Sequence, residues 1–252
     1  MYGRFAAVES EHWWFQGRRR VVAEVMRDYL ADHPGRAEGL RLLDVGSGTG
    51  EMVDMLKEFG HVTALDSSPH AVEYCRQRHP SGVEVRQGIA PDDLVPGERF
   101  DLVTAFDVVE HIDDDVAALR AFRSALPVGG RMVLTVPAYH TLWSNHDVYS
   151  GHMRRYRRDT LLDLVRKAGG FRVDRTSYFN SLLFLPALAV RLTDRARQRL
   201  APRPGERADP HLRVPPALVN RALLRVFGTE ARILRRMEPP FGVSLLALCS
   251  AV

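Results

Sequence analysis

The chain contains very little cysteine: its two residues, Cys75 and Cys249, stand far apart and share no metal-ligand spacing. A disulfide framework is therefore not expected, and a reducing compartment is the simplest setting. The amino-terminal residues contain no apolar signal core. The longest apolar stretch, residues 182–190, is interrupted by Pro186 and is too short to span a bilayer. We expect a protein of the cytoplasm.

No DNA- or RNA-binding motif and no internal repeat is visible, although the chain is basic. It has 35 Lys and Arg against 31 Asp and Glu, a pI near 9.3, and many arginines between residues 191 and 207. A basic segment can bind nucleic acid or an anionic membrane, but it is more often a solvated face. We expect no nucleic-acid partner. Peripheral membrane contact stays open, because the apolar residues 182–190 precede the arginines, and so does the oligomeric state.

The chain does have the layout of a nucleotide-binding βαβ unit. Leu40–Val45 is a short apolar run that predicts a buried strand, and it leads into three glycines at alternate positions. A helical pattern over residues 52–59 follows, and residues 61–66 predict a second strand that ends in an acid. Glycines let the backbone approach a ligand closely, and a helix N-terminus favours an anion. Asp66 is placed for the hydroxyls of a ribose.

The glycine spacing does not fit a dinucleotide. A dinucleotide loop reads G-x-G-x-x-G, whereas here Asp44 precedes Gly46-x-Gly48-x-Gly50 and Glu51 follows. Two acids are poorly placed for a pyrophosphate, but they suit a ligand with a cationic part and a small carboxylate. A nicotinamide-dependent reductase is therefore the weaker alternative.

Strands and helices alternate along most of the chain. Further strands are predicted at 83–87, 100–106, 131–136, 171–174 and 241–249. Helices are predicted within 1–37, from Pro69 behind a serine cap, after Asp113, and at 159–168, 181–200 and 217–237. Residues 201–216 are rich in Pro and Arg and are expected to form an exposed linker.

Three segments resemble the motifs of class I S-adenosylmethionine-dependent methyltransferases. They are the glycine loop, FDLVTAFDVVEHI at 100–112 and LPVGGRMVLTVP at 126–137. The resemblance implies one α/β domain over 1–252, with a doubly wound, Rossmann-like sheet of seven strands and one antiparallel edge. It also implies an N-terminal helical lid at 1–37, a cofactor-binding core at 40–137, and a substrate lid, helical cap and closing strands at 138–252.

The resemblance also implies S-adenosylmethionine as the cofactor and suggests where it binds. The glycine loop would lie against the methionine part, and Asp66 with Ser67 would hold the ribose. The acid that many members have near the adenine is missing from residues 88–92, so the backbone of Ile89 and Ala90 is expected to replace it, with Asp92 or Asp93 as substitutes. The expected cofactor residues are Arg18, Asp44, Gly46, Ser47, Gly48, Gly50, Asp66, Ser67, Ile89, Ala90, Phe106 and Asp107.

Arg18 belongs to an unusual aromatic segment near the amino terminus. Trp13, Trp14 and Phe15 would be costly if exposed, so they either pack on the core or close over the cofactor. HWWF..RR resembles a subset of bacterial small-molecule methyltransferases that also carry GH.RRY, found here at 151–156. In that subset Arg18 would reach the methionine carboxylate.

A polar segment at residues 139–156 follows the fifth predicted strand, at the sheet edge where open α/β folds bind ligands. Its histidines do not have a standard metal-ligand spacing, so we expect no metal and interpret the segment as a substrate lid. The alternative is structural, with Arg154 or Arg155 paired to acids. The expected catalytic residues are His111, His146, Asp147, His152 and Tyr156; a histidine is a base near neutral pH, or it merely packs beside the cleft.

These observations predict an enzyme that methylates an oxygen or nitrogen of a small molecule, either a natural product or a lipidic acceptor. Methylation of carbon in a quinone-type pathway is the alternative within enzymes. A catalytically silent cofactor-binding protein with a membrane or partner role is the alternative outside them. The clustered histidines favour catalysis, because a silent protein has no need of them beside the cleft.

Overall fold

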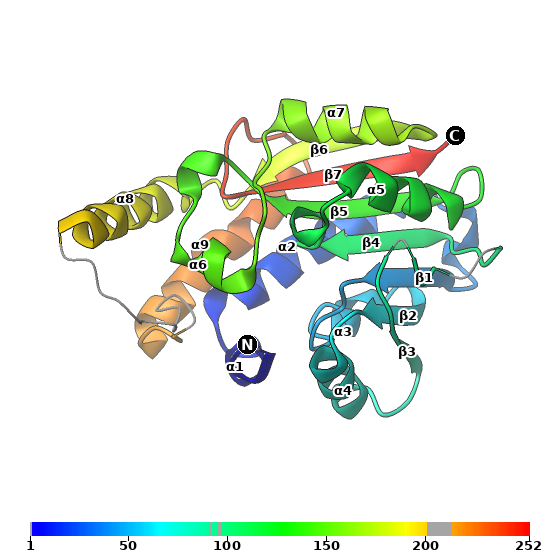
Figure 1. Cartoon of the computed structure of the whole chain (residues 1–252), viewed down its shortest axis with the longest axis horizontal. Coiled ribbons are helices and arrows are strands. Elements are labelled where there is room, and N and C mark those ends of the chain that lie inside the picture. The colour runs from blue at the N-terminus through cyan, green and yellow to red at the C-terminus, as the bar shows by residue number, and fades with distance from the viewer. Residues whose placement is uncertain (1, 91, 95–96, 201–212) are drawn as a thin grey trace.

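The computed structural model describes residues 2–90, 92–94, 97–200 and 213–252; the predicted linker at 201–216 lies mostly outside them. Seven strands form one sheet in the order β3-β2-β1-β4-β5-β7-β6 (Figure 1). The strands are β1 Leu40–Val45, β2 Gly60–Asp66, β3 Val83–Gln87, β4 Leu102–Phe106, β5 Arg131–Pro137, β6 Phe171–Phe179 and β7 Ser244–Ala251. The predicted seven-stranded, doubly wound α/β sheet is confirmed.

The position of the antiparallel strand differs from the prediction. β7 runs antiparallel to both of its neighbours, β5 and β6, so it lies inside the sheet and β6 forms the edge. Seven of the eight β7 residues are buried, as a strand covered on both faces requires, whereas the first half of β6 alternates between half-buried and exposed positions. The expected antiparallel edge strand was therefore wrong.

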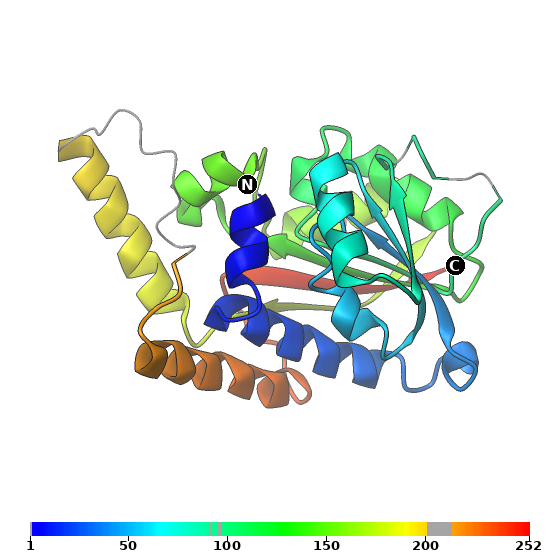
Figure 2. The same cartoon turned by 90° about the horizontal axis from the view of Figure 1, so that it is seen from below.

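Helices cover both faces of the sheet (Figures 1 and 2). One apolar core joins the sheet to α2, α3, α4 and α9, and a second core joins its other face to α5 and α7. These helices are α2 Trp13–Tyr29, α3 Val53–Leu56, α4 Pro69–Arg78, α5 Asp115–Ser124, α7 Arg158–Ala168 and α9 Ala217–Leu234. α2 and α9 pack closely because Gly17 carries no Cβ that would collide with the Phe227 ring.

The remaining elements gather at the carboxyl ends of the parallel strands. They are α1 Tyr2–Val8, α6 Asn145–Ser150, α8 Phe184–Leu200 and the 3-10 turns η2 Val109–His111 and η3 His140–Leu142; η1 Pro34–Arg36 follows α2. α1 lies in front of this edge between α4 and α6, and α8 extends away from the sheet (Figure 2).

The predicted lid at 1–37 divides into two parts. α2 buries Val21, Val22 and Met26 in the core, so it belongs to the body of the fold, and α1 is the part that lies over the sheet edge. The helix after the glycine loop is shorter than the pattern predicted, with four residues. That the chain forms one domain over 1–252 stays a prediction.

Candidate functional site

A cavity of about 630 Å³ lies at the carboxyl edge of β1, β4 and β5. Its described walls come from segments far apart in the sequence: α1, α2, the glycine loop, the turn after β4, α6, the residues around His152, α8 and the start of α9. This is the edge at which open α/β sheets bind ligands.

The glycine loop forms one wall of the cavity. Gly48 has a φ of +57°, which favours glycine, and a Cβ there would meet no atom within 4 Å. Gly46 also has a positive φ, and a Cβ on it would collide with Val108. Gly48 therefore leaves the backbone of the loop open toward the cavity, as close approach to a ligand requires, whereas Gly46 makes room for the Val108 side chain.

Two buried acids flank this loop. Asp44, at the end of β1, accepts a hydrogen bond from the Thr104 hydroxyl at 2.7 Å, and burial raises its pKa to about 7. Glu51 forms an ion pair with Arg19, and burial raises its pKa to about 6 despite the nearby arginines. Both carboxyls line the cavity and hold protons more readily than an exposed acid.

The predicted nucleoside contacts lie apart from the cavity. Asp66 accepts hydrogen bonds from the backbone N–H groups of Gly48 and Ser68 at 2.8 and 2.9 Å, so it holds the loop in shape. The Ile89 N–H donates to the Asp93 carboxylate at 2.8 Å, and the Ile89 side chain is exposed. The described residues that line the cavity do not include Gly50, Asp66, Ser67, Ile89 or Ala90.

Arg18 spans from α2 to the end of β4. It forms an ion pair with Asp107, and its guanidinium carbon lies 4.9 Å from the centre of the Trp14 ring. Within the described structure its Nε is buried without a hydrogen-bond partner. Asp107 has a φ of +56°, a strained conformation that turns the chain into the cavity directly after Phe106.

The residues after α1 are fastened to the glycine loop. Glu9 is 3% exposed, accepts hydrogen bonds from the Thr49 hydroxyl at 2.6 and 2.7 Å, and pairs with Arg78 of α4 at 2.8 Å. Tyr2, at the start of α1, lies near Asp66. Burial raises the pKa of Tyr2, and the negative charge of Asp66 raises it further. Sequence reasoning missed Glu9, because nothing in its local pattern shows a partner forty residues away.

A buried carboxylate organises the opposite wall. Asp147 accepts hydrogen bonds from His152 Nδ1 at 2.8 Å and from Arg155 Nε and Nη2 at 2.6 and 3.0 Å. Burial alone would raise its pKa, but the bonds from His152 and Arg155 outweigh burial and lower it. Asp147 is fully buried and is not among the described residues that line the cavity, so it positions His152 and does not face a ligand.

Three histidines from this wall face the cavity: His111, His146 and His152. The rings of His111 and His152 lie edge to face with their centres 4.8 Å apart, and His111 Nδ1 lies 3.2 Å from the Gly151 carbonyl oxygen. Burial and the neighbouring His152 lower the pKa of His111. The structure thus brings together the three predicted histidines.

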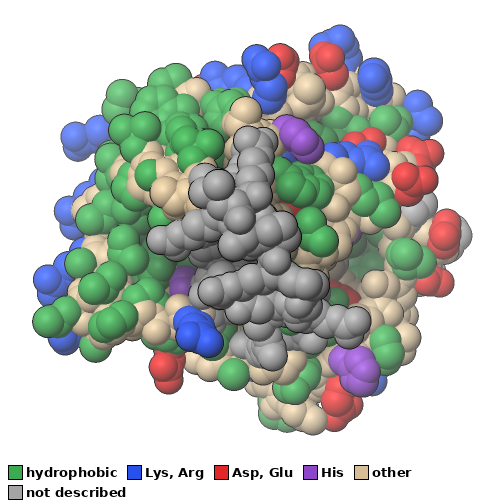
Figure 3. All heavy atoms as spheres, turned by 60° about the vertical axis from the view of Figure 1, so that its left-hand side comes forward, with side chains coloured by type: hydrophobic (Ala, Val, Ile, Leu, Met, Phe, Trp, Pro, Cys, Tyr) green, Lys and Arg blue, Asp and Glu red, His purple; other side chains and the backbone are tan. Residues whose placement is uncertain are grey.

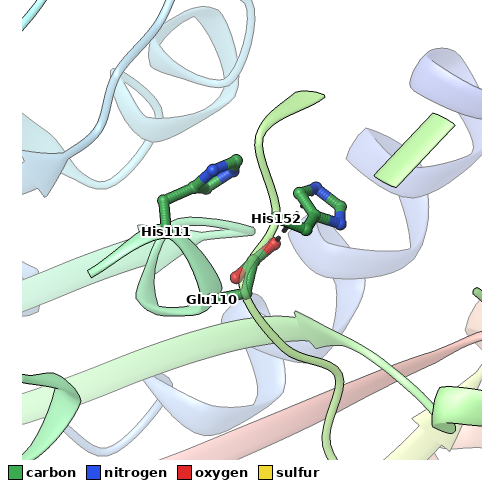
Figure 4. Close-up of side chains that lie close together, drawn as sticks. All are labelled: Glu110, His111 and His152. Atoms are coloured by element: carbon green, nitrogen blue, oxygen red, sulfur yellow. Dashed lines mark ion pairs between the residues drawn. The ribbon is translucent and has the colours of Figure 1, made fainter. Parts of the chain in front are cut away.

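Glu110 lies beneath these histidines and was missed by sequence reasoning (Figure 4). Its side chain is fully buried, and within the described structure neither carboxyl oxygen has a hydrogen-bond partner. His152 Nε2 lies 3.9 Å from Glu110 Oε1. Burial raises the pKa of Glu110 well above its usual value, and the Asp107 charge adds to this.

Tyr156, a predicted catalytic residue, is not among the described residues that line the cavity. Its ring packs in the core beneath α5 and α7, and its hydroxyl donates to Asp115 at 2.9 Å. Arg154 pairs with the same carboxylate at 2.8 Å. The GH.RRY segment therefore supplies His152 and Arg155 to the cavity wall, and both of its arginines pair with acids, as the structural alternative proposed.

Apolar side chains form the end of the cavity next to α8. They are Leu183, Pro186, Ala187 and Val190, with Leu223 from α9 and Trp13 from α2. Trp13 and Trp14 pack against the core and also line the cavity, so the packing alternative holds, while closure of these side chains over the cofactor stays a prediction. The cavity accordingly has a loop end, a histidine wall and an apolar end.

Comparison with known proteins adds to this geometry. A family model described as "Methyltransferase domain" matches residues 15–175. Two proteins of Cereibacter sphaeroides named "Ubiquinone biosynthesis O-methyltransferase" are similar: one is 34% identical over 173 residues, covering 62% of this chain and 69% of that protein. The other is 31% identical over 191 residues, covering 69% and 76%.

The fold also has solved counterparts. A structure described as a SAM-dependent methyltransferase from Archaeoglobus fulgidus superposes with a TM-score of 0.55 at 20% identity, covering 92% of this chain and 94% of that one. At this identity the likeness shows the fold alone.

Proposed function

The chain belongs to the S-adenosylmethionine-dependent methyltransferases, and from that premise we propose that it methylates a hydroxyl oxygen of a small molecule with an apolar tail. The cofactor is S-adenosylmethionine, which supplies a methyl group activated on a sulfonium. The names of the Cereibacter relatives support oxygen, rather than nitrogen or carbon, as the acceptor atom.

The loop end of the cavity fits the methionine part of this cofactor. Three buried polar atoms there, Ser47 Oγ, Glu51 Oε2 and Arg18 Nε, have no hydrogen-bond partner in the described structure. A ligand that carries both an ammonium and a carboxylate would satisfy donors and acceptors of this kind. We assign Arg18 to the carboxylate, Asp44 to the ammonium side, and the backbone of Gly46, Ser47 and Gly48 to close contact, with the open space at Gly48.

Most of the remaining cofactor assignments extend past the cavity, whereas Phe106 and Asp107 line it. Asp66 and Ser67 would hold the ribose and Ile89 and Ala90 the adenine, while Gly50 closes the loop and Phe106 and Asp107 face the methyl group. In this structure Tyr2 of α1 lies near Asp66, where the ribose would bind. We therefore assign the lid role to α1, which must yield around Tyr2 when the nucleoside binds, with Glu9 fixing its far end to Thr49.

One observation carries the acceptor assignment: the three histidines and the apolar end belong to the same cavity as the glycine loop. A polar head held at His111, His146 and His152 would face the cofactor, while a tail extends toward Leu183 and Ala187. Alignment contributes about 7–11 kcal/mol to such a transfer, and a base adds about 10²–10⁴-fold. Asp147 and Tyr156 act through other residues in this scheme.

The outer surface near the apolar end suits a lipidic acceptor. Leu185 is 70% exposed and Leu218 is 75% exposed, and hydrophobic side chains gather on this face beside Lys and Arg (Figure 3). None of the described helices is both long enough and apolar enough to cross a bilayer. We propose peripheral contact of this face with a membrane that holds the acceptor; a cytoplasmic location stays a prediction.

The test is a matched pair of catechols that share one head group, one with an isoprenoid or alkyl tail and one without it. We expect S-adenosylhomocysteine to form with both, an O–CH₃ group in the product by NMR, and a kcat/KM at least tenfold higher for the tailed compound. Ala187→Phe should fill the apolar end and remove the preference for the tail, while turnover of the tailless catechol stays within about twofold. A methyl group on carbon or nitrogen, or equal kcat/KM for both, would contradict the proposal.

A further inference from the structure

We propose that Glu110, His111 and His152 form a binding site for one divalent transition-metal ion (Figure 4). Two of these side chains come from η2 and the third from the loop after α6. Each offers one ligand atom, and the three atoms lie within 4.8 Å of one another. Metal–nitrogen and metal–oxygen bonds of about 2.0–2.2 Å separate two ligands by up to about 4 Å, so rotation of one imidazole closes the set around an ion.

The environment of the Glu110 carboxyl is a second observation in favour of a cation at this position. It is completely buried, and within the described structure neither of its oxygens accepts or donates a hydrogen bond. Buried polar oxygens without a hydrogen-bond partner cost about 1–3 kcal/mol each, and a bound cation would satisfy both oxygens of this carboxyl. His152 Nε2 already lies 3.9 Å from Glu110 Oε1, a separation suited to two ligands of one ion.

The outer contacts of both histidines prepare them as ligands. His152 Nδ1–H donates to the Asp147 carboxylate at 2.8 Å, and His111 Nδ1–H donates to the Gly151 carbonyl at 3.2 Å. With each Nδ1–H engaged in this way, Nε2 is the nitrogen that can offer a lone pair to an ion. Hydrogen bonds from the second ring nitrogen to a carboxylate or carbonyl are the usual support of metal-bound histidines.

The donor set indicates which ions fit. Two imidazole nitrogens and one carboxylate favour zinc, cobalt, iron or manganese over magnesium and calcium, which prefer oxygen ligands. Three protein ligands leave at least one position open, and both histidines line the cavity. Resting on the proposed function, that open position would take the acceptor hydroxyl and lower its pKa.

The experiment titrates the untagged, chelator-dialysed full chain with Co²⁺ and follows the visible absorption of the bound ion, with Mg²⁺ in parallel. We expect one Co²⁺ per chain and much weaker binding of Mg²⁺. Glu110→Gln, which keeps the shape of the buried side chain, and His152→Ala should each weaken Co²⁺ binding at least tenfold. His146→Ala is the matched control, because it removes a histidine of the same cavity that lies outside the set, and it should change affinity less than twofold.

Two further measurements keep the outcomes distinct. Calorimetry with S-adenosylhomocysteine checks that each variant is folded, and Co²⁺ should raise the unfolding temperature of the parent chain but not of Glu110→Gln. No stoichiometric Co²⁺ binding, or binding that survives Glu110→Gln, would overturn the metal site even if the catechols are methylated. Stoichiometric binding without catechol methylation would instead support the metal site and contradict the proposed function.

Discussion

The two sides of the cavity are built in different ways. On the cofactor side, the lining residues of the loop come from one continuous stretch, residues 44–51, which is held by hydrogen bonds such as that from the Gly48 N–H to Asp66. On the acceptor side, separate segments meet through side chains: Asp147 joins His152 and Arg155, and Glu110 lies below them. A change on the first side should therefore affect binding, whereas a change on the second should affect stability and turnover.

The largest expected effect is on the cofactor side. Gly48→Val places a branched side chain in the open space at a φ of +57°, so we expect loss of S-adenosylhomocysteine binding by calorimetry, more than about 10³-fold. The strained backbone should cost only about 1–3 kcal/mol of unfolding free energy. Gly151→Val is the matched control, because Gly151 also has a positive φ and open space but lies outside the described cavity lining. Unchanged affinity in Gly48→Val would remove the loop from the cofactor site.

The next effect belongs to the acceptor side. Asp147→Ala leaves the buried Arg155 without its carboxylate, and breaking a buried ion pair from one side costs about 3–5 kcal/mol. Urea unfolding measures this loss. The double variant Asp147→Ala/Arg155→Met should recover part of it, because the unpaired charge is then gone. If Asp147→Ala unfolds like the parent chain, the acid does not hold this wall together.

The sequence predicts the two sides of the cavity to different extents. The glycine loop and the strand that ends in Asp66 were predictable because a local pattern of residues encodes a local backbone shape, whereas the binding of a ribose by Asp66 stays a prediction. Tyr156 and Asp147 stand in the polar segment, but whether a side chain faces a cavity or the core depends on partners such as Asp115 and Arg155, which no spacing rule identifies. Glu110 was missed for the same reason, since its neighbour His152 lies 42 positions away in the sequence.

A smaller effect should separate the three histidines. We expect one of the three single variants His111→Ala, His146→Ala and His152→Ala to lower kcat by about 10²-fold. That residue is the one that removes the proton from the acceptor hydroxyl. Affinity for S-adenosylhomocysteine should change less than twofold in all three, because the cofactor contacts lie on the other side of the cavity. Steady-state kinetics with the tailed catechol measures the first quantity and calorimetry the second. Full turnover in all three variants would mean that alignment alone drives the transfer.

The smallest expected effect is a pH dependence that comes from Asp44 on the cofactor side. Burial raises the pKa of Asp44 to about 7, well above the 3.8 of an ordinary aspartate. The folded chain therefore holds this proton at pH 6 and the unfolded chain does not. The contribution of Asp44 to the unfolding free energy is thus greatest below about pH 4, falls as the pH rises toward 7, and is lost above it.

A cofactor ammonium near Asp44 favours its ionised form and so must expel that proton at pH 6. We expect S-adenosylhomocysteine to release most of one proton per chain at pH 6, almost none at pH 8, and to bind up to about tenfold more tightly at the higher pH. Calorimetry in two buffers of different ionisation enthalpy measures the release. Asp44→Asn should abolish it, whereas Glu51→Gln should leave most of it, because burial raises the pKa of Glu51 only to about 6. If Asp44→Asn releases as many protons as the parent chain, Asp44 only anchors Thr104, and the ammonium lies elsewhere in the cavity.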